Sequence, residues 1–388
     1  MKVLYLTGMY PTPAYPQKGI FCHEQVKALK NLGIEVTVVV PVVFYDREIK
    51  VKEWEYEGVH IRYVRFFKLP KALDFHKTGK SLFKRLDKAL DLKSFDVYHA
   101  DSPLPTGQAV MIASKKYGVP FIVHGHGLDV FFDESYAGMR NCHKIASVCE
   151  NVYDKANAVV GVSEKVLDKV RERVDLTDKA FVAYNGVDTA SFAPVEKEKT
   201  DSLTVISIGN LIPLKGHRYL LQAVKALKDK GIENIKCQIV GRGYLDEELK
   251  AQARELGIEK QVEFKGYVPY AEVATLLKNA DIFALPSYYE ALGCVYLEAM
   301  ACGIPAIGCY ENGIDEIISN GEDGYLVHNH SVDELTECLL TLTDTATREK
   351  VGKAAREKAV SSCQWKHSAK TLTQAYEKVV YGRGVDGN

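Results

Sequence analysis

Two glutamates, Glu290 and Glu298, flank a glycine in the stretch P-S-Y-Y-E-A-L-G-C-V-Y-L-E-A-M-A-C-G-I-P, which ends at Pro305. Glu290 lies in a loop after an apolar run typical of a buried strand, and Glu298 lies in the helix that Gly293 opens. The amides at a helix N-terminus lie at the positive end of the helix dipole and suit a phosphate. The loop carboxylate could bind sugar hydroxyls, and the helix carboxylate could bind the paired hydroxyls of a ribose. The spacing predicts a site for a nucleotide-diphosphate sugar.

Two glutamates at this spacing are, by themselves, more often solvated surface residues. Here a buried strand precedes them, an L-G turn lies between them and E-A-M-A-x-G-x-P follows. This stretch resembles the signature of the retaining glycosyltransferases of family 4, which have the GT-B fold. The resemblance implies that Glu290 binds donor-sugar hydroxyls near the reacting centre. It also implies that Leu292 and Gly293 hold the diphosphate and that Glu298 binds the ribose.

A lysine follows another predicted strand, in the sequence G-N-L-I-P-L-K-G that ends at Gly216. Lys215, just before a helix, is placed to neutralise a diphosphate as a point charge. The sequence resembles the family motif G-R-L-x-x-x-K-G, but Asn210 stands where the family has an arginine. The missing cation could be replaced by Arg242 or by Arg218.

Two weaker motifs complete the second half of the chain. Arg242 lies in G-R-G, which lacks the third glycine of a dinucleotide-binding fingerprint and could equally be a helix cap. In F-K-G-Y-V-P the family resemblance implies that the backbone around Tyr267 and Val268 holds the nucleotide base. Ordinary packing of the aromatic ring is the alternative interpretation.

The first half of the chain carries a histidine-rich loop after a buried strand, V-H-G-H-G-L-D. His126 and Asp129 resemble the family's H-G-x-D motif, in which the histidine lies beside the donor sugar and the aspartate is structural or on the acceptor side. His124 does not fit that spacing, and a lone loop histidine is more often a surface residue. Gly19, in the first strand–helix loop, is expected to let the backbone approach the donor phosphate, although the family often has two glycines there.

Strand and helix patterns alternate along the whole chain, which predicts doubly wound parallel sheets. In the first half the expected strands are 2–7, 35–40, 59–64, 96–100, 120–123, 156–160 and 179–184, with helices at 20–32, 80–92, 107–116 and 164–172. In the second half the expected strands are 203–208, 236–240, 261–264, 281–285, 306–308 and 325–327. The alternating acids Glu53, Glu55 and Glu57 are expected on a solvated strand edge rather than at a metal site.

A chain of 388 residues predicts two domains. We expect an acceptor-side Rossmann-like domain at 1–190, a polar linker, and a nucleotide-sugar-binding Rossmann-like domain at 203–364. By resemblance to GT-B proteins, a helix at 365–381 crosses back onto the first domain. Two such halves suggest a ligand held in a cleft at the carboxyl ends of the strands.

Composition excludes several classes of protein. Hydrophobic and charged fractions of 46% and 26% are typical of a globular protein, and no run of eighteen apolar residues is present. The nine cysteines form no C-x-x-C, so we expect buried thiols in a reducing cytoplasm. With no D-x-D at a strand end and no paired histidines at ligand spacing, no metal or other cofactor is expected. Helix amides and cations would then stabilise the leaving diphosphate.

Charge is concentrated in residues 60–93, which hold ten basic and three acidic residues interleaved with aromatics. A basic amphipathic helix with aromatics can lie on an anionic membrane, here the inner face of the plasma membrane. The alternative is a solvated helix that buries Leu82, Phe83, Leu86 and Leu90 in its own domain. Nucleic acid is not an expected partner, because the rest of the chain is not basic.

The resemblance implies metal-independent transfer of a hexose from a nucleotide sugar, with a UDP-sugar expected, to an acceptor hydroxyl with retention of configuration. The expected acceptor is a lipid-linked glycan or polysaccharide precursor. Retention needs no enzymic nucleophile if the leaving phosphate takes the acceptor's proton, which agrees with the absence of a matched carboxylate pair. The alternatives are a GT-B sugar-nucleotide epimerase, a Rossmann dehydrogenase and a non-enzymic membrane-associated scaffold.

Overall fold

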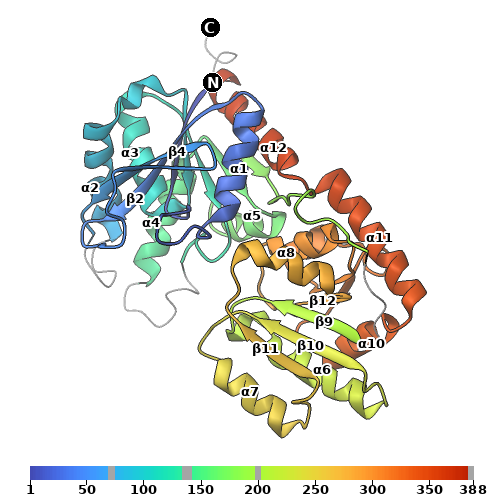
Figure 1. Ribbon diagram of the computed structural model, residues 1–388. Coiled ribbons are helices and arrows are strands. Elements are labelled where there is room, and N and C mark those ends of the chain that lie inside the picture. Colours follow the sequence, from blue (N-terminus) through green and yellow to red (C-terminus); the bar gives the residue numbers. More distant parts are fainter. Residues whose placement is uncertain (69–74, 133–141, 197–201, 383–388) are drawn as a thin grey trace. The chain divides into compact units, whose positions relative to one another are not determined.

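The chain divides into two compact units, each built on one β-sheet (Figure 1). The computed structural model describes residues 1–68, 75–132, 142–196 and 202–382. The N-terminal unit comprises residues 1–185 together with the C-terminal segment from Trp365, and the C-terminal unit comprises residues 186–364. Residues 186–196, expected to lie largely in a linker, belong to the C-terminal unit. There Phe192 is buried, and Arg356 donates to the carbonyls of Thr189 and Phe192 at 3.1 and 2.8 Å.

The N-terminal unit contains an eight-stranded sheet in the order β3-β4-β2-β1-β5-β6-β7-β8. All neighbours are parallel except β3 and β4, the hairpin at one edge. The central strands are apolar runs buried on both faces, as parallel sheets covered by helices require. The strands are β1 (Lys2–Thr7), β2 (Glu35–Val43), β3 (Glu53–Tyr56), β4 (Val59–Phe66), β5 (Val97–Asp101), β6 (Phe121–Gly125), β7 (Ala158–Gly161) and β8 (Ala180–Val182).

Helices join these strands as the alternating pattern predicts. They are α1 (Ile20–Asn31), α2 (Phe75–Ala89), α3 (Gln108–Tyr117), α4 (Cys142–Lys155), α5 (Glu164–Arg171) and α12 (Trp365–Tyr381), with short turns η1 (Leu92–Ser94) and η2 (Pro103–Gly107). Helix α2 begins five residues before the expected start at Lys80, and α4 was not predicted.

The last helix, α12, lies beside α1 and is part of the N-terminal unit (Figure 1). It contributes Leu372 and Tyr376 to the core that α1 and the strands share. Gln25 of α1 donates a hydrogen bond to Ser368 Oγ at 3.1 Å, so polar as well as apolar contacts join the two helices.

The C-terminal unit contains six parallel strands in the order β11-β10-β9-β12-β13-β14. The strands are β9 (Leu203–Ile208), β10 (Ile235–Val240), β11 (Val262–Gly266), β12 (Ile282–Ala284), β13 (Ala306–Cys309) and β14 (Tyr325–Val327). The helices are α6 (His217–Asp229), α7 (Asp246–Glu255), α8 (Tyr270–Asn279), α9 (Cys294–Ala301), α10 (Val332–Thr341) and α11 (Thr345–Ser362), with short turns η3 (Pro213–Lys215) and η4 (Gly313–Glu316).

Both sheets are doubly wound, as predicted. In each, the first strand is central and the order reverses beside it, between β1 and β5 in one sheet and between β9 and β12 in the other. The loops that leave the carboxyl ends of such a strand pair diverge to opposite faces, and ligands of open α/β sheets bind there. The loops after β1, β5, β9 and β12 are therefore the places to look for functional side chains.

The packing of α12 gives a first prediction. Replacing the buried Leu372 with alanine should reduce the free energy of unfolding of the N-terminal unit by about 2–5 kcal/mol, because it leaves a cavity in the shared core. Both tryptophans of the chain, Trp54 and Trp365, pack against this core, so tryptophan fluorescence in a urea titration reports this unit specifically. The exposed Lys370→Ala is the matched control on the same helix. An unchanged midpoint for Leu372→Ala would contradict this packing.

Candidate functional site

In the C-terminal unit an ion pair joins the two loops at the switch point. Lys215, at the end of the loop after β9, pairs through Nζ with a carboxylate oxygen of Glu290, in the loop after β12. The two side chains are only 18% and 15% exposed, so neither extends into solvent. The Tyr288 amide donates to the Leu214 carbonyl at 3.1 Å, which ties the loop backbones together as well. Two residues chosen from separate motifs thus lie in direct contact.

Gly216 allows this close approach. Its φ of 68° is in the left-handed region, and a Cβ there would lie 2.0 Å from the Pro286 carbonyl oxygen. Any side chain at this position would separate the loop that holds Lys215 from the loop that holds Glu290.

Asn312 fixes the second loop and was missed by sequence reasoning. Its Oδ1 accepts the Glu290 amide at 2.7 Å, and its Nδ2 donates to the Ser287 carbonyl at 3.0 Å. The side chain is 4% exposed, so these hydrogen bonds are shielded from water. The only feature of the nearby sequence that marks Asn312 is the Asn-Gly pair after β13, which is typical of an ordinary turn.

Gly293 begins the helix that the sequence predicted. It is the N-cap of α9, with φ 81°, and no side chain caps this helix end. Leu292 beside it is buried, and the Tyr296 hydroxyl donates to the Leu285 carbonyl, which anchors the first turn of α9 on the end of β12. An uncapped helix start beside a lysine is an arrangement that binds phosphate.

Glu298 lies in α9 and is 5% exposed, so it is not a solvated helix residue. Burial raises the pKa of its carboxyl to about 7, although the hydrogen bond from Tyr270 opposes the shift. The Tyr270 hydroxyl donates to Oε1 at 2.9 Å. A buried carboxylate with so little protein hydrogen bonding is energetically costly, which suits a group that a ligand's hydroxyls complete.

The two candidate replacements for the missing arginine differ in their partners. Arg218 pairs with Glu248 at 2.6 Å. Arg242 lies over the Tyr267 ring at 4.9 Å and has no acidic partner within the described parts of the chain. The Leu211 amide donates to the Arg242 carbonyl at 3.0 Å, so Arg242 adjoins the loop that carries the exposed Asn210. Val268 is partly buried next to Tyr267.

In the N-terminal unit His126 is paired with Asp101, a residue that no sequence motif indicates. Asp101 ends β5 and is completely buried at its side chain, and His126 Nε2 contacts its Oδ1. Burial alone would raise the pKa of Asp101, but His126 and two further histidines hold it below its usual range. Burial likewise opposes charge on His126, but Asp101 raises its pKa. Since 25 residues separate the pair, no local motif identifies it.

His124 and His99 extend this cluster inward. The His124 ring lies 4.4 Å from the ring of His126 and 5.4 Å from that of His99. Burial lowers the pKa of His99 to about 3 and that of His124 well below its usual value, so both are neutral. His99 Nδ1 is 2.6 Å from the hydroxyl of Tyr376, on α12.

The two remaining predicted positions have contacts within this unit. Asp129 Oδ1 accepts the His126 amide at 2.9 Å, which shapes the loop around the histidine. A Cβ on Gly19 would lie 2.2 Å from the Met9 carbonyl, so the loop's own backbone requires glycine there. Contacts of Asp129 with an acceptor and of Gly19 with a donor phosphate stay predictions.

Three clusters of described side chains bring potential metal ligands within 4.8 Å of one another. They are Cys22 with Asp101 and His126, His99 with Asp101 and His124, and His23 with Glu24 and Glu57. No cluster includes Glu290 or Glu298. The prediction that the reaction needs no metal stays a prediction.

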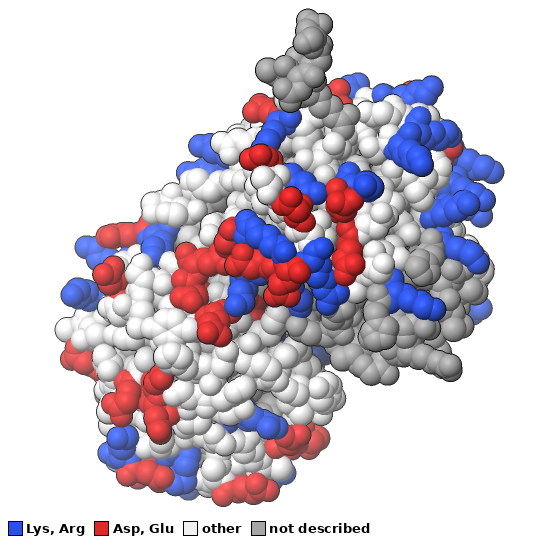
Figure 2. Space-filling model, turned by 180° about the vertical axis from the view of Figure 1, so that it is seen from behind, with Lys and Arg blue, Asp and Glu red and all other residues white. Residues whose placement is uncertain are grey.

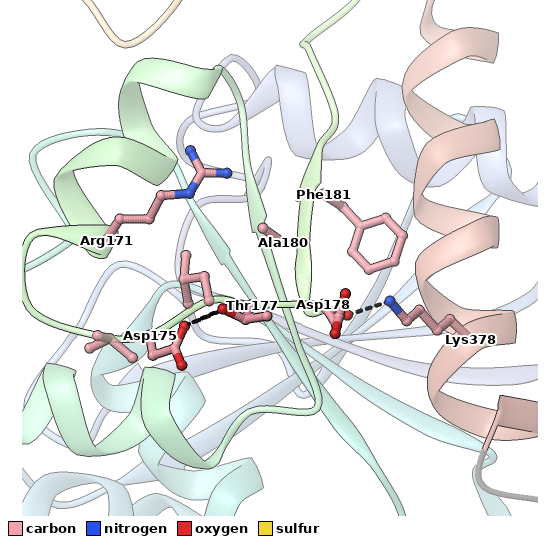
Figure 3. A pocket seen from close by; sticks show the side chains of 9 residues that line it. Arg171, Asp175, Thr177, Asp178, Ala180, Phe181 and Lys378 are labelled. Carbon is pink, nitrogen blue, oxygen red and sulfur yellow. Dashed lines mark hydrogen bonds between the residues drawn. The ribbon is translucent and has the colours of Figure 1, made fainter.

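A cavity of about 670 Å³ lies elsewhere in the N-terminal unit, between the end of α5, strand β8 and α12 (Figure 3). Its polar residues already have partners, and Arg171 pairs with Glu164 and Asp168 outside the lining. Asp175 accepts from Thr177, and Lys378 donates to the Asp178 carbonyl and lies 5.5 Å from the Phe181 ring centroid. None of the predicted site residues lines it.

The basic segment 60–93 is described except for residues 69–74, so Lys71 lies outside the described residues. Leu82 and Leu86 of α2 are buried in the N-terminal unit and Phe83 and Leu90 partly so, as the solvated-helix interpretation expects. The cations face outward, and Figure 2 shows Lys and Arg gathered along the edge over α2. The exposed ones on this helix are Lys77, Lys80, Lys84, Arg85 and Lys88. Among the described residues, no helix combines the length and apolar character that crossing a membrane requires.

Comparison with known proteins agrees with the fold and with the family that the sequence resembles. The family model for glycosyltransferase family 4 matches residues 19–191, and the model for glycosyl transferases group 1 matches residues 188–358. A D-inositol 3-phosphate glycosyltransferase of Corynebacterium glutamicum (strain R) is 27% identical, over 92% of this chain and 91% of the relative.

Two solved structures are similar over nearly their whole length. Sucrose-phosphate synthase from Thermosynechococcus elongatus has a TM-score of 0.81 at 18% identity, covering 97% of this chain and 98% of that one. Anabaena HepE in complex with UDP-glucose has a TM-score of 0.75 at 20% identity, covering 97% and 100%. The protein is thus a glycosyltransferase with the GT-B fold of two Rossmann-like domains. It belongs to glycosyltransferase family 4.

The burial of Glu298 predicts a measurable titration. Its carboxyl should titrate near pH 7, well above a free glutamate, because burial penalises the charged form. The raised pKa stabilises the C-terminal unit below about pH 4.5, and that contribution is lost as pH rises through 7. Carbon-13 NMR of glutamate-labelled protein measures the midpoint, and Glu298→Gln assigns the signal. Tyr270→Phe should raise the midpoint further. A midpoint in the range of exposed glutamates would contradict the burial.

Proposed function

We propose that the protein is a retaining, metal-independent hexosyltransferase that uses a UDP-sugar and a hydroxyl acceptor. The observation that carries the proposal is the Lys215–Glu290 pair at the switch point, beside the uncapped start of α9. This places a cation, a helix N-terminus and a carboxylate together, which are the groups that a sugar diphosphate needs.

The ion pair suggests how the two side chains are held before a donor binds. Without donor, Lys215 and Glu290 neutralise each other in a mostly buried position. A bound diphosphate would take Lys215 as its counter-ion, and the released Glu290 carboxylate would accept hydrogen bonds from the sugar hydroxyls. Glu298 would bind the ribose, and the backbone around Tyr267 and Val268 would hold the base.

Charge stabilisation of the leaving group would come from this chain's own cations and amides. As the bond between the anomeric carbon and the phosphate oxygen breaks, negative charge grows on the diphosphate next to Lys215 and the start of α9. The acceptor oxygen attacks the same face, and its proton passes to the leaving phosphate oxygen, so configuration is retained. His126, held by Asp101, would orient the sugar at the reacting carbon.

Two classes of acceptor are considered. One follows from the name of a similar protein, and the other from the basic surface over α2. One similar protein is named a D-inositol 3-phosphate glycosyltransferase. The basic edge over α2 favours instead a lipid-linked acceptor at an anionic membrane, which is the class we propose. Each exposed basic residue near such a surface contributes about 1 kcal/mol of attraction.

Exposed aromatic side chains beside α2 add to this surface. The Phe44 and Phe67 rings stack at 5.0 Å and are 53% and 50% exposed, and Tyr45 packs on Phe44 at 5.2 Å. They follow β2 and β4 at the carboxyl edge of the sheet, and the Phe67 amide donates to Ser81 of α2 at 3.1 Å. Aromatic rings next to cations suit the interfacial layer of a bilayer.

The direct test supplies UDP-, GDP- and ADP-sugars with a set of lipid-linked and soluble acceptors, in the presence of EDTA. We expect transfer from one UDP-sugar to a lipid-linked acceptor, undiminished by EDTA, and NMR of the product should show an α-linkage from an α-configured donor. Interconversion of the free nucleotide sugar without transfer would identify an epimerase instead. Inverted configuration or loss of activity in EDTA would contradict the proposed mechanism.

Arg242 should supply the cation that Asn210 lacks. Arg242→Ala should weaken UDP binding by about tenfold or more, the effect of losing one charge-assisted hydrogen bond. Arg218→Ala is the matched control, since Arg218 is already paired with Glu248. Isothermal titration with UDP measures both. Equal effects of the two substitutions would contradict the assignment.

The membrane surface is tested by co-sedimentation with vesicles of phosphatidylglycerol and phosphatidylcholine. Wild-type protein should bind the anionic vesicles and be released by salt. Replacing Phe44 and Phe67 with serine should reduce binding several-fold, as a result of losing apolar contact with the bilayer. Tyr244→Ser removes an aromatic of the C-terminal unit that is even more exposed and should leave vesicle binding unchanged. Binding that is insensitive to both salt and the double substitution would exclude this surface.

A further inference from the structure

A thiol, a carboxylate and an imidazole meet below the histidine loop. Cys22 comes from α1, Asp101 from the end of β5 and His126 from the loop after β6. Cys22 Sγ lies 3.1 Å from Asp101 Oδ2, and His126 Nε2 contacts the other carboxylate oxygen. Cys22 and Asp101 are buried, whereas the His126 side chain is 15% exposed, which leaves an approach from one side.

The other two clusters are less suited to an added cation. His99, Asp101 and His124 are all fully buried, so an ion has no exposed member to approach. In the cluster of His23, Glu24 and Glu57, the Lys27 ammonium already lies 2.9 Å from both carboxylates. A second cation there would have to displace the lysine.

The ligand set of the first cluster is that of a zinc site. Zinc binds thiolate sulfur at about 2.3 Å and imidazole nitrogen or carboxylate oxygen at about 2.0–2.2 Å, so tetrahedral ligands lie about 3.5 Å apart. The three ligand atoms here all lie within 4.8 Å of one another and need only small side-chain movements. Water entering past His126 would complete four-fold coordination. Sulfur favours zinc over magnesium or calcium.

We propose that Cys22, Asp101 and His126 form a Zn²⁺ site whose occupation inhibits sugar transfer. Binding forms a Zn–S bond and releases the thiol proton to water. The proton on His126 Nε2 leaves that nitrogen, to Nδ1 of a neutral ring or to water from an imidazolium. Nε2 then gives its lone pair to the metal, its contact with Asp101 is broken, and the remaining ring proton is on Nδ1. With Nε2 bound to zinc, the imidazole can no longer use that nitrogen to donate a hydrogen bond to the donor sugar or accept one from it. Only the inhibition rests on the proposed function, and the metal site stands apart from it.

Cobalt spectroscopy tests the site without any enzyme assay. Titrating the full-length, tag-free protein with Co²⁺ should give one equivalent of tetrahedral cobalt with a thiolate-to-metal charge-transfer band, which Zn²⁺ should abolish. Cys22→Ser should remove the charge-transfer band. Cys338→Ser, which changes a partly buried thiol in the C-terminal unit, should retain it.

Inhibition is measured in parallel with the same proteins. Zn²⁺ should inhibit the wild type and Cys338→Ser equally. Cys22→Ser should need at least about tenfold more Zn²⁺, because loss even of an outer-shell partner typically costs about 10–100-fold in metal affinity and Cys22 is a direct ligand. Thermal unfolding and the second variant Cys22→Ala ensure that any loss reflects the ligand and not misfolding. No thiolate band in wild-type protein, or an unchanged band in folded Cys22→Ser, would overturn the site. Equal zinc inhibition of wild type and Cys22→Ser would overturn the inhibitory role.

Discussion

The contact between Lys215 and Glu290 is the interaction on which the functional interpretation depends. It exists because a parallel sheet reverses its strand order between β9 and β12, so that two loops far apart in sequence leave the same edge. Gly216 and Asn312 then hold the loops close enough for the charges to meet. An opposite charge at short range makes it possible to keep both groups mostly buried.

In the N-terminal unit, too, side chains from separate segments meet where the strand order of the sheet reverses. Thr7 and Asp101 end neighbouring strands at its switch point, and the Thr7 hydroxyl donates to Asp101 at 2.6 Å. Asp101 in turn holds His126, and α12 reaches the same cluster through Tyr376 and His99. The end of the chain therefore supports the histidine cluster as well as the core. One buried carboxylate accepts contacts from a hydroxyl, a thiol and an imidazole, which is also why this cluster could hold a metal.

Much of the fold and part of the site could be predicted from the sequence, because the signals for them lie within short stretches of the chain. Buried parallel strands are continuous apolar runs, and glycine at positions 216 and 293 marks helix starts, so the doubly wound sheets and the site motifs were visible. The roles of Asp101 and Asn312 could not be predicted from the sequence. Each acts through contacts with residues more than twenty positions away, and nothing next to it in sequence distinguishes it from an ordinary strand end or turn. The burial of Glu298 also depends on tertiary packing around α9, which no helix pattern encodes.

Helix α2 shows that one sequence pattern can fit two different structures. A basic amphipathic pattern fits both a membrane surface and a solvated helix, and the structure buries Leu82 and Leu86 inside the unit. Among the described residues of this region, the cations of α2 and the aromatics after β2 and β4 are therefore the groups that we propose for membrane contact. Phe67 lies within the basic segment and was one of its interleaved aromatics, whereas Phe44 and Tyr45 lie outside it and were not indicated by the sequence pattern.

The most direct test of the central claim is a crystal structure of the protein with UDP bound. The account predicts that the β-phosphate lies within hydrogen-bond distance of Lys215 Nζ and of the amides at the start of α9. It also predicts that the ribose hydroxyls lie on Glu298 and that the Glu290 carboxylate is released from Lys215. UDP bound elsewhere, or a phosphate that leaves the Lys215–Glu290 pair intact and α9 untouched, would contradict it.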